Sequence, residues 1–441
     1  MQPLLLLILA AAPPGGGDPL WWVFFADRGP MAAERVAEAA ALLAGTARAE
    51  RRLAAGVPLA SELDLPPWPA YVEEVALLAG SVPRTESRLL DAVSIEADEE
   101  EIAAVSCLPF VAGVRPVARS AWTPVSPGPA PAGAENFSAG QLCQAGVGTL
   151  IAHGYTGSGT VVGILDTGFN LWHTALADAE ILDQYDFLDD DPDPSQQEGD
   201  PPGQANHGTA VLSIIAADEP GIYTGGARGA SFLLAKTEDT SGEYQQEEDF
   251  WVAGLEWLEQ EGADLVSSSL GYIDWYGYED LDGGTAVTTI AADLAASLGM
   301  PVVNAIGNNG PAPGTLIAPA DGDSVFAVGG VDEAGTLAYF SSRGPTADGR
   351  TKPDACAAGV NVVFISPEGQ TGYSSGNGTS FATPIVSSAV ALLLEAHPEW
   401  SSLDALDALR ATASQAGAPD DDLGWGIIDA DAACRWRSVT G

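Results

Sequence analysis

The stretch VVGILDTG, residues 161–168, decides the fold of this 441-residue chain. Its apolar run has no polar alternation, which is typical of a β-strand covered on both faces, and Asp166 stands where that strand ends. Similar apolar runs occur at residues 232–235, 265–269, 301–305 and 325–328, with helical patterns between them at 208–217, 247–261, 285–298 and 381–396. This alternation predicts an α/β fold with a mostly parallel central sheet flanked by helices.

Two further segments each place a reactive side chain at the start of an apolar helix. Residues 206–211 (NHGTAV) carry His207, and residues 378–384 (GTSFATP) carry Ser380. Functional residues of an open parallel sheet gather outside the carboxyl ends of its strands, so helix N-termini pointing at this edge bring both side chains toward Asp166. Pro384 is expected in the first turn of its helix, where a missing N–H removes no hydrogen bond.

The three residue types suit nucleophilic catalysis. A serine hydroxyl needs a neighbouring imidazole to take its proton, and the imidazole needs an acceptor on its other nitrogen. A helix N-terminus also favours negative charge that develops on bound substrate. Each segment alone has an ordinary explanation: a turn after a strand, a helix cap with a satisfied histidine, or a serine N-cap. Together, in the order Asp–His–Ser, they follow the chain order known for subtilisin.

With that order, the chain resembles the subtilisin-like serine proteases over roughly residues 145–433. The matching stretches are those quoted above together with residues 268–271, 305–310, 340–345, 352–354 and 424–429. The resemblance implies that Ser380 is the nucleophile and His207 the general base. It also implies that Asp166 orients the imidazole.

The resemblance assigns two further functions within the catalytic domain. It selects Asn308 as the oxyanion donor, although a Gly-Asn-Asn-Gly run is also typical of a tight turn and composition alone does not choose between its two asparagines. It implies that Ser269, Leu270 and Gly271 form the strand that pairs with the substrate backbone. A loose alignment places Ile317 near the floor of the substrate side-chain pocket, which would favour smaller side chains.

The chain before the catalytic segments is organised differently. Residues 1–17 contain a short apolar run that ends in small residues, and we expect a secretory signal peptide. Residues 18–118 show the patterns of a small α+β unit, with a helical stretch at 31–55; the resemblance implies an inhibitory propeptide, and an accessory domain that stays attached is the alternative. Residues 119–140 are rich in Pro, Ala and Gly, which predicts a linker, and the catalytic domain is expected over 141–441.

The composition narrows the choice of partners. Seventeen Lys and Arg stand against 61 Asp and Glu, a net charge of −44, while 46% of the residues are hydrophobic, which excludes a disordered acidic chain. An acidic surface disfavours nucleic acid and anionic membranes as partners. The resemblance implies protein or peptide substrates and the chain's own propeptide as an inhibitory partner, and we expect a monomer. Residues 1–120 carry −7 and residues 121–441 carry −37. A saline habitat or plain lineage bias both account for this excess.

No cofactor is expected for catalysis. Eight acids between residues 183 and 200 could bind structural calcium, although their spacing fits no EF-hand loop and a solvated loop is the favoured interpretation. The four cysteines are too few for a disulfide scaffold, and one pair among three of them stays open: Cys143, Cys356 and Cys434, with Cys107 outside that set.

These features predict a secreted serine endopeptidase that is made as a self-processing zymogen. A non-catalytic binding protein that kept the fold is the second hypothesis. A serine esterase is the third, but the residues around Ser380 do not fit G-x-S-x-G, and the Asp–His–Ser order differs from that of the α/β-hydrolases.

Overall fold

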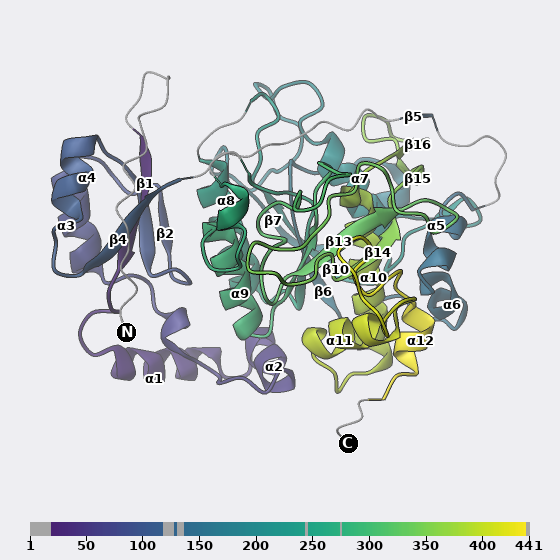
Figure 1. The fold of residues 1–441 in the computed structure, drawn as a ribbon, viewed down its shortest axis with the longest axis horizontal. Coiled ribbons are helices and arrows are strands. Elements are labelled where there is room, and N and C mark those ends of the chain that lie inside the picture. Colours follow the sequence, from purple (N-terminus) through teal and green to yellow (C-terminus); the bar gives the residue numbers. More distant parts are fainter. Residues whose placement is uncertain (1–18, 118–127, 130–135, 243–245, 274–275, 438–441) are drawn as a thin grey trace.

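The computed structural model describes residues 19–117, 128–129, 136–242, 246–273 and 276–437, and it contains a small N-terminal domain beside a larger α/β domain (Figure 1). The predicted signal segment, residues 1–17, and most of the predicted linker lie outside these described residues.

The N-terminal domain is an antiparallel sheet of order β2-β3-β1-β4. Its elements are β1 (Leu20–Phe25), α1 (Ala32–Leu43), α2 (Ala47–Ala54), η1 (Glu62–Asp64), α3 (Pro69–Ala79), β2 (Thr85–Ser87), β3 (Ala92–Glu96), α4 (Glu99–Val105) and β4 (Val111–Pro116). Successive side chains of a strand point to opposite faces, so Trp21 and Val23 of β1 pack with α3 and α4. Leu20 and Trp22 face the other way and join a core of the larger domain.

The larger domain is built on a seven-stranded sheet of order β14-β13-β12-β11-β6-β10-β7. Its strands are β6 (Val161–Asp166), β7 (Glu180–Asp186), β10 (Ser231–Lys236), β11 (Leu265–Ser268), β12 (Val302–Ala305), β13 (Phe326–Val331) and β14 (Ala355–Ala358). Every pairing within it is parallel, which confirms the predicted fold class. From β6 the chain first builds β7 and β10 on one side and then β11 to β14 on the other. Asp166 therefore lies at the point where the strand order reverses.

Helices cover both faces of this sheet. On one face lie α8 (Glu247–Glu261) and α9 (Val287–Ser297), next to the N-terminal domain, and on the other lie α7 (Asn206–Ala216) and α10 (Thr379–Ala396) (Figure 1). The strand β10 shows the division, because Phe232 and Leu234 enter the core of α7 and α10 whereas Leu233 and Ala235 enter that of α8 and α9. Within the described residues, α10 alone is long and apolar enough to cross a membrane, but 83% of it is buried inside the fold, as in a core helix.

Smaller elements complete the domain. They are β5 (Gly128–Pro129), α5 (Ala139–Gln144), α6 (Val147–Ala152), η2 (Thr174–Leu176), β8 (Asp218–Glu219), β9 (Tyr223–Thr224), η3 (Tyr278–Asp280), β15 (Val362–Ile365), β16 (Tyr373–Gly376), α11 (Ser402–Thr412) and α12 (Ala430–Cys434). The short strand β5, inside the predicted linker, pairs with β16 of the larger domain. All four cysteines are free.

Two sequence expectations are corrected by the structure. The helical stretch predicted over residues 31–55 is two helices, because Gly45 adopts a φ of +83° and the hydroxyl of Thr46 then caps α2 by accepting from the N–H of Ala49. The helix that carries Ser380 begins at Thr379, so Pro384 lies beyond its first turn.

Candidate active site

Asp166 is the last residue of β6, and it is fully buried. Its Oδ1 accepts a hydrogen bond from the backbone N–H of Thr167 (2.8 Å) and lies 2.7 Å from Nδ1 of His207. The backbone N–H of Thr237, just after β10, donates to the backbone oxygen of Asp166 (3.0 Å). The carboxylate is thus held from its own turn, and the backbone of Asp166 is held by the residue that follows the neighbouring strand.

His207 lies in the first turn of α7, which approaches the end of β6 very closely. Gly208 makes this approach sterically feasible, because a Cβ at that position would lie 3.0 Å from Cβ of Asp166 and would collide with the carbonyl of Gly168. The backbone N–H of Gly208 donates to the hydroxyl of Thr167 (3.3 Å). The HGT pattern therefore sets the distance between imidazole and carboxylate as well as supplying the imidazole.

Ser380 lies in the first turn of α10, and 6% of its surface is exposed. Pro384, four residues later in the same helix, changes the hydrogen bonding of the Ser380 backbone. A residue with an N–H at position 384 would donate to the carbonyl of Ser380 in a regular helix, and proline cannot. The hydroxyl of Ser269 donates to that carbonyl instead (2.9 Å). The hydroxyl of Ser380 in turn donates weakly to the carbonyl of Ser269 (3.4 Å). The neighbouring ring of Phe381 has its centroid 6.0 Å from that of His207.

Asn308 follows β12 and is tied to the residue before Ser380. Its Oδ1 accepts from the backbone N–H of Thr379 (2.9 Å) and from the hydroxyl of Thr379 (3.1 Å). With the oxygen held there, its amide NH₂ is left on the side of Gly378: a Cβ built on Gly378 would lie 3.8 Å from Nδ2. Asn309, by contrast, is exposed. The structure thus separates two asparagines that the sequence alone left equivalent.

The segment Ser269-Leu270-Gly271 continues the line of β11 past the start of α10. The carbonyl of Leu270 accepts from Nδ2 of Asn304 (3.0 Å), which fixes the segment to β12. A Cβ on Gly271 would collide with the side chain of Ile317, and a Cβ on Gly307 would lie 3.3 Å from its Cδ1. Ile317 therefore fills the space between the Gly271 and Gly307 segments, and it is half-buried there.

The acidic loop at residues 183–200 is anchored beside the site by one lysine. Lys236 is the parallel partner of Asp166 in the sheet, and its Nζ lies 2.7 Å from Oδ2 of Asp186 and 3.1 Å from Oδ2 of Asp200. Burial by itself lowers the pKa of Lys236, but the two carboxylates outweigh it, so the pKa is raised and the lysine stays charged. No local sequence pattern indicates this ion triad, because its members are spread over 51 residues.

The sequence profile of the subtilase family matches residues 157–426. The chain belongs to the subtilase family. The profile of the peptidase S8 propeptide domain of Bacteroidota matches residues 20–127.

Several subtilisins are similar to this subtilase over its catalytic part. Subtilisin of Bacillus pumilus is 33% identical over 290 residues, which cover 65% of this chain and 94% of that protein. Subtilisin E of Bacillus subtilis is 33% identical over 65% of this chain and 68% of its own length. Subtilisin Savinase of Lederbergia lenta is 34% identical over 64% of this chain and 93% of its own length. The subtilase is thus a subtilisin-like serine endopeptidase, a hydrolase, with an S8 propeptide domain at its N-terminus.

The propeptide domain contacts the subtilase domain mainly through α8. The carboxylate of Glu256 accepts from the hydroxyl of Ser87 and from the backbone N–H groups of Arg88 and Leu89, both at 3.0 Å. The hydroxyl of Ser94 donates to Asp249 (2.7 Å). Sequence reasoning missed these acids, since in a helix they are indistinguishable from a solvated face.

Residues 352–354 of the subtilase domain join two neighbouring strands of the sheet. Nζ of Lys352 lies 2.7 Å from Oδ2 of Asp354, and Arg410 lies 2.8 Å from Oδ1 of the same residue. Burial raises the pKa of Asp354, but Lys352 and then Arg410 outweigh it and leave the pKa below its ordinary value. Asp354 also accepts from the backbone N–H of Ala327 (2.8 Å), so this motif joins β13 to β14.

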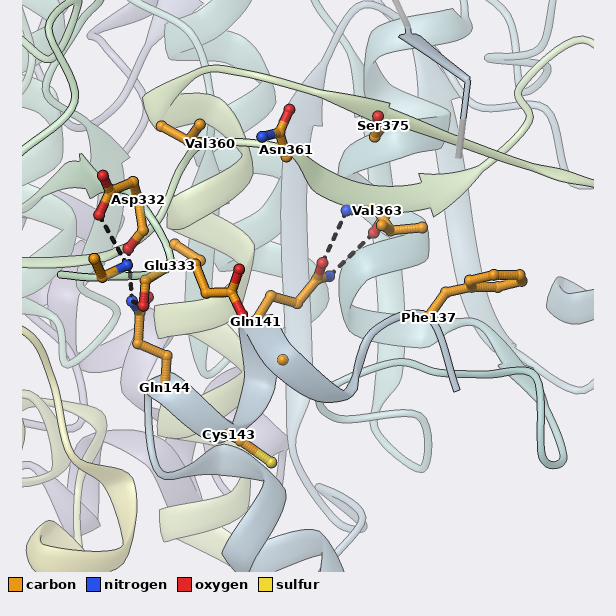
Figure 2. Close-up of a pocket in the computed structure, with 13 residues that line it drawn as sticks. Phe137, Gln141, Cys143, Gln144, Asp332, Glu333, Val360, Asn361, Val363 and Ser375 are labelled. Atoms are coloured by element: carbon orange, nitrogen blue, oxygen red, sulfur yellow. Dashed lines mark hydrogen bonds between the residues drawn. The ribbon is translucent and has the colours of Figure 1, made fainter. Parts of the chain in front are cut away.

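A pocket of about 1180 Å³ lies away from the candidate catalytic residues, between α5 and the loops that follow β13 and β14 (Figure 2). The side-chain amide of Gln141 accepts from the N–H of Val363 (2.8 Å) and donates to its carbonyl (3.0 Å). The amide of Gln144 donates to the carbonyl of Asp332 (2.7 Å). None of Asp166, His207 and Ser380 lines this pocket. The pocket is therefore not part of the candidate active site.

Proposed function

We propose that this subtilase is a secreted endopeptidase that processes its own precursor and uses Asp166, His207, Ser380 and Asn308 for catalysis. The observation that carries the proposal is the 2.7 Å contact between Nδ1 of His207 and Oδ1 of Asp166. It lies at the carboxyl edge where the strand order reverses, beside the helix turn that carries Ser380.

In the proposed mechanism, Oγ of Ser380 attacks the carbonyl carbon of the scissile peptide bond while its proton passes to Nε2 of His207. Asp166 accepts from Nδ1–H and stabilises the imidazolium. The carbonyl π electrons move onto oxygen, and Nδ2 of Asn308 and the backbone N–H of Ser380 donate to that oxyanion. His207 then gives the proton to the departing amine nitrogen as the C–N bond breaks. Water repeats these steps on the acyl-serine, and no cofactor takes part.

The substrate is a protein or peptide in extended conformation. Its backbone would pair with Ser269, Leu270 and Gly271, which place it across the start of α10. The mutual hydrogen bonds of Ser269 and Ser380 support this assignment, because they fix the position of the pairing segment relative to the nucleophile. The net charge of −44 favours a soluble monomer without nucleic-acid or membrane partners.

Self-cleavage is assigned between Val117 and Gly128. The backbone N–H of Val117 donates to the carbonyl of Leu20 in the N-terminal sheet, whereas Gly128 pairs with Ser375 of the catalytic domain. A cut between them separates the two domains without breaking either sheet. We assign residues 18–118 to the propeptide, 119–140 to the linker and 141–441 to the catalytic domain.

We assign no calcium site to the acidic residues 183–200. Among the described residues, no group of three or more His, Cys, Asp or Glu side chains gathers closely enough to hold a metal ion. Asp186 and Asp200 of this loop are instead paired with Lys236. Asp190 accepts from the hydroxyl of Tyr185 (2.6 Å).

The test uses Ser380→Ala in the full chain. The wild type should label with a fluorophosphonate, hydrolyse casein far better than a short-chain ester, and lose its N-terminal segment; the variant should do none of these. Asn308→Ala should lower kcat strongly with little change in KM, and Asn309→Ala is its matched control. A wild type that resists the label would favour the binding-protein hypothesis. Export is tested by sequencing the N-terminus of the Ser380→Ala precursor recovered from the medium, which should lack residues 1–17 and keep the propeptide domain.

A further inference from the structure

A single carboxylate of α8 collects four guanidinium groups of the N-terminal domain. Oε1 of Glu259 accepts from Nε of Arg48 (3.2 Å) and Nη2 of Arg52 (3.1 Å), and it also pairs with Arg51. Oε2 accepts from Arg48 (2.6 Å) and from Arg88. The side chain of Glu259 is fully buried, and the arginines lower its pKa to about 2 although burial acts the other way.

Three of these arginines come from α2, which sits at the C-terminal ends of α8 and α9. Nη1 of Arg51 donates to the carbonyl of Ala263, just past the end of α8. Carbonyl groups left unpaired at a helix C-terminus attract cations. Two glycines that follow α8 and α9 allow α2 to approach these helix ends closely. A Cβ on Gly262 would lie 3.1 Å from Cβ of Ala47, and a Cβ on Gly299 would lie 2.9 Å from Cβ of Ala55.

The contact of α2 depends on charge rather than on apolar burial. The buried residues of this eight-residue helix are Arg51 and Arg52, whereas its leucine, Leu53, is 81% exposed. Asp64 of the N-terminal domain holds two of the guanidinium groups in place, with Arg52 at 2.7 Å and Arg48 at 2.9 Å. The chain has 17 Lys and Arg residues in all, and four of them bind the single carboxylate of Glu259.

We propose that α2 is an arginine latch, formed by Arg48, Arg51 and Arg52 on Glu259, that keeps the propeptide domain bound to the catalytic domain after the linker is cut. It extends the docking surface of the N-terminal sheet, which packs on α8 and α9, and Arg88, next to β2, meets the α2 arginines on Glu259. The latch rests on the proposed zymogen function, because only a cleaved precursor needs a non-covalent hold. The partner of α2 is the pair of C-terminal ends of α8 and α9, where Glu259 lies.

The experiment measures retention of the domains without using catalysis. The full chain carries Ser380→Ala, an N-terminal tag after residue 17, and a site for an added sequence-specific protease in place of part of residues 119–127. The nicked protein is immobilised by its tag, and the release of the catalytic domain into buffer is followed over time. An inactive wild-type enzyme would overturn the proposed function and leave this measurement intact.

Glu259→Gln should speed release at least about 100-fold, because removing one partner of a buried ion pair leaves the other charge uncompensated. Ala55→Leu keeps every charge but drives a side chain into the space at Gly299, and it should speed release by a similar factor. Glu261→Gln, an exposed acid on the same helix, and Leu53→Ala, an exposed apolar residue on α2, are the matched controls and should release at the wild-type rate.

Thermal unfolding of each variant before nicking shows whether it folds. If Glu259→Gln does not fold, Ala55→Leu decides the question alone, since its change lies in the N-terminal domain. Release of Ala55→Leu within threefold of the wild-type rate would overturn the latch. Faster release by Leu53→Ala would also overturn it, because α2 would then be generally unstable rather than held by Glu259. Faster release by Glu261→Gln would overturn it too, because retention would then not depend on Glu259 in particular.

Discussion

Shortening Ile317 should widen the range of substrate side chains that the enzyme accepts. Its side chain fills the space between Gly271, on the proposed substrate-pairing segment, and Gly307, just before Asn308. A substrate carbonyl held at Ser380 would direct the side chain of its own residue into this gap. Wild-type enzyme should therefore prefer a small residue there, such as alanine.

The magnitude follows from counting carbon atoms. Ile317→Ala removes three carbons, and a leucine side chain has three more carbons than alanine. Each buried methylene contributes about 0.8 kcal/mol, so the ratio of kcat/KM for leucine over alanine should rise by roughly 50-fold. Ile317→Val removes one carbon and should raise the ratio only about fourfold on the same scale.

The assay compares peptide anilides that differ only in the residue whose carbonyl is attacked. The kcat/KM for the alanine substrate should stay near its wild-type value in both variants, which separates a change in specificity from a loss of folded enzyme. A leucine-to-alanine ratio that stays within threefold of wild type in Ile317→Ala would refute the placement of this side chain. An equal rise in both variants would refute the carbon count.

Three further predictions follow from the site and from the domain contact. Thr379→Val should lower kcat by about fivefold, the effect of losing one hydrogen bond to Asn308, while Thr379→Ser restores it; equal kcat values would contradict the role of the hydroxyl. Gly208→Ala should slow fluorophosphonate labelling of the nucleophile by about 100-fold, because its Cβ pushes α7 away from Asp166, and unchanged labelling would exclude this effect. Burial raises the pKa of Asp249 to about 7 in the precursor, so its contribution to domain retention is present at low pH and is lost as the pH rises through 7. Release from the nicked precursor should therefore be faster at pH 8 than at pH 5.5, and Asp249→Asn should show a smaller difference; identical pH dependence would contradict this linkage.

The sequence was most informative where local patterns carry the structure. The boundaries of α8 agree with the predicted range 247–261, and β6 and β10 agree to within a residue, because uninterrupted apolar runs are typical of strands in a doubly covered sheet. The strands β7 and β14 were not predicted. One is polar and partly exposed (EILDQYD) and the other consists of small residues (ACAA), so neither has the composition of a buried strand.

The candidate site was predictable as a set of residue types but not as a set of contacts. Asp166, His207 and Ser380 were selected by motif and order. The hydrogen bond from the hydroxyl of Ser269 to the carbonyl of Ser380 depends on where α10 begins relative to Pro384. The helix begins two residues earlier than predicted, so Pro384 lies beyond the first turn and leaves the carbonyl of Ser380 without its helical donor. The pairing of Glu259 with α2 joins residues more than 200 positions apart, and no local pattern reports such a contact.

The placement of the arginines has a consequence for the finished enzyme. Residues 121–441 carry −37, and the guanidinium groups around Glu259 act as built-in counterions while α8 is covered by the precursor's own N-terminus. In the proposed self-processing, departure of that segment would hydrate Glu259, and the enzyme would then draw its counterions from the medium. Salt around the finished enzyme would screen the negative charge that these arginines balance in the precursor.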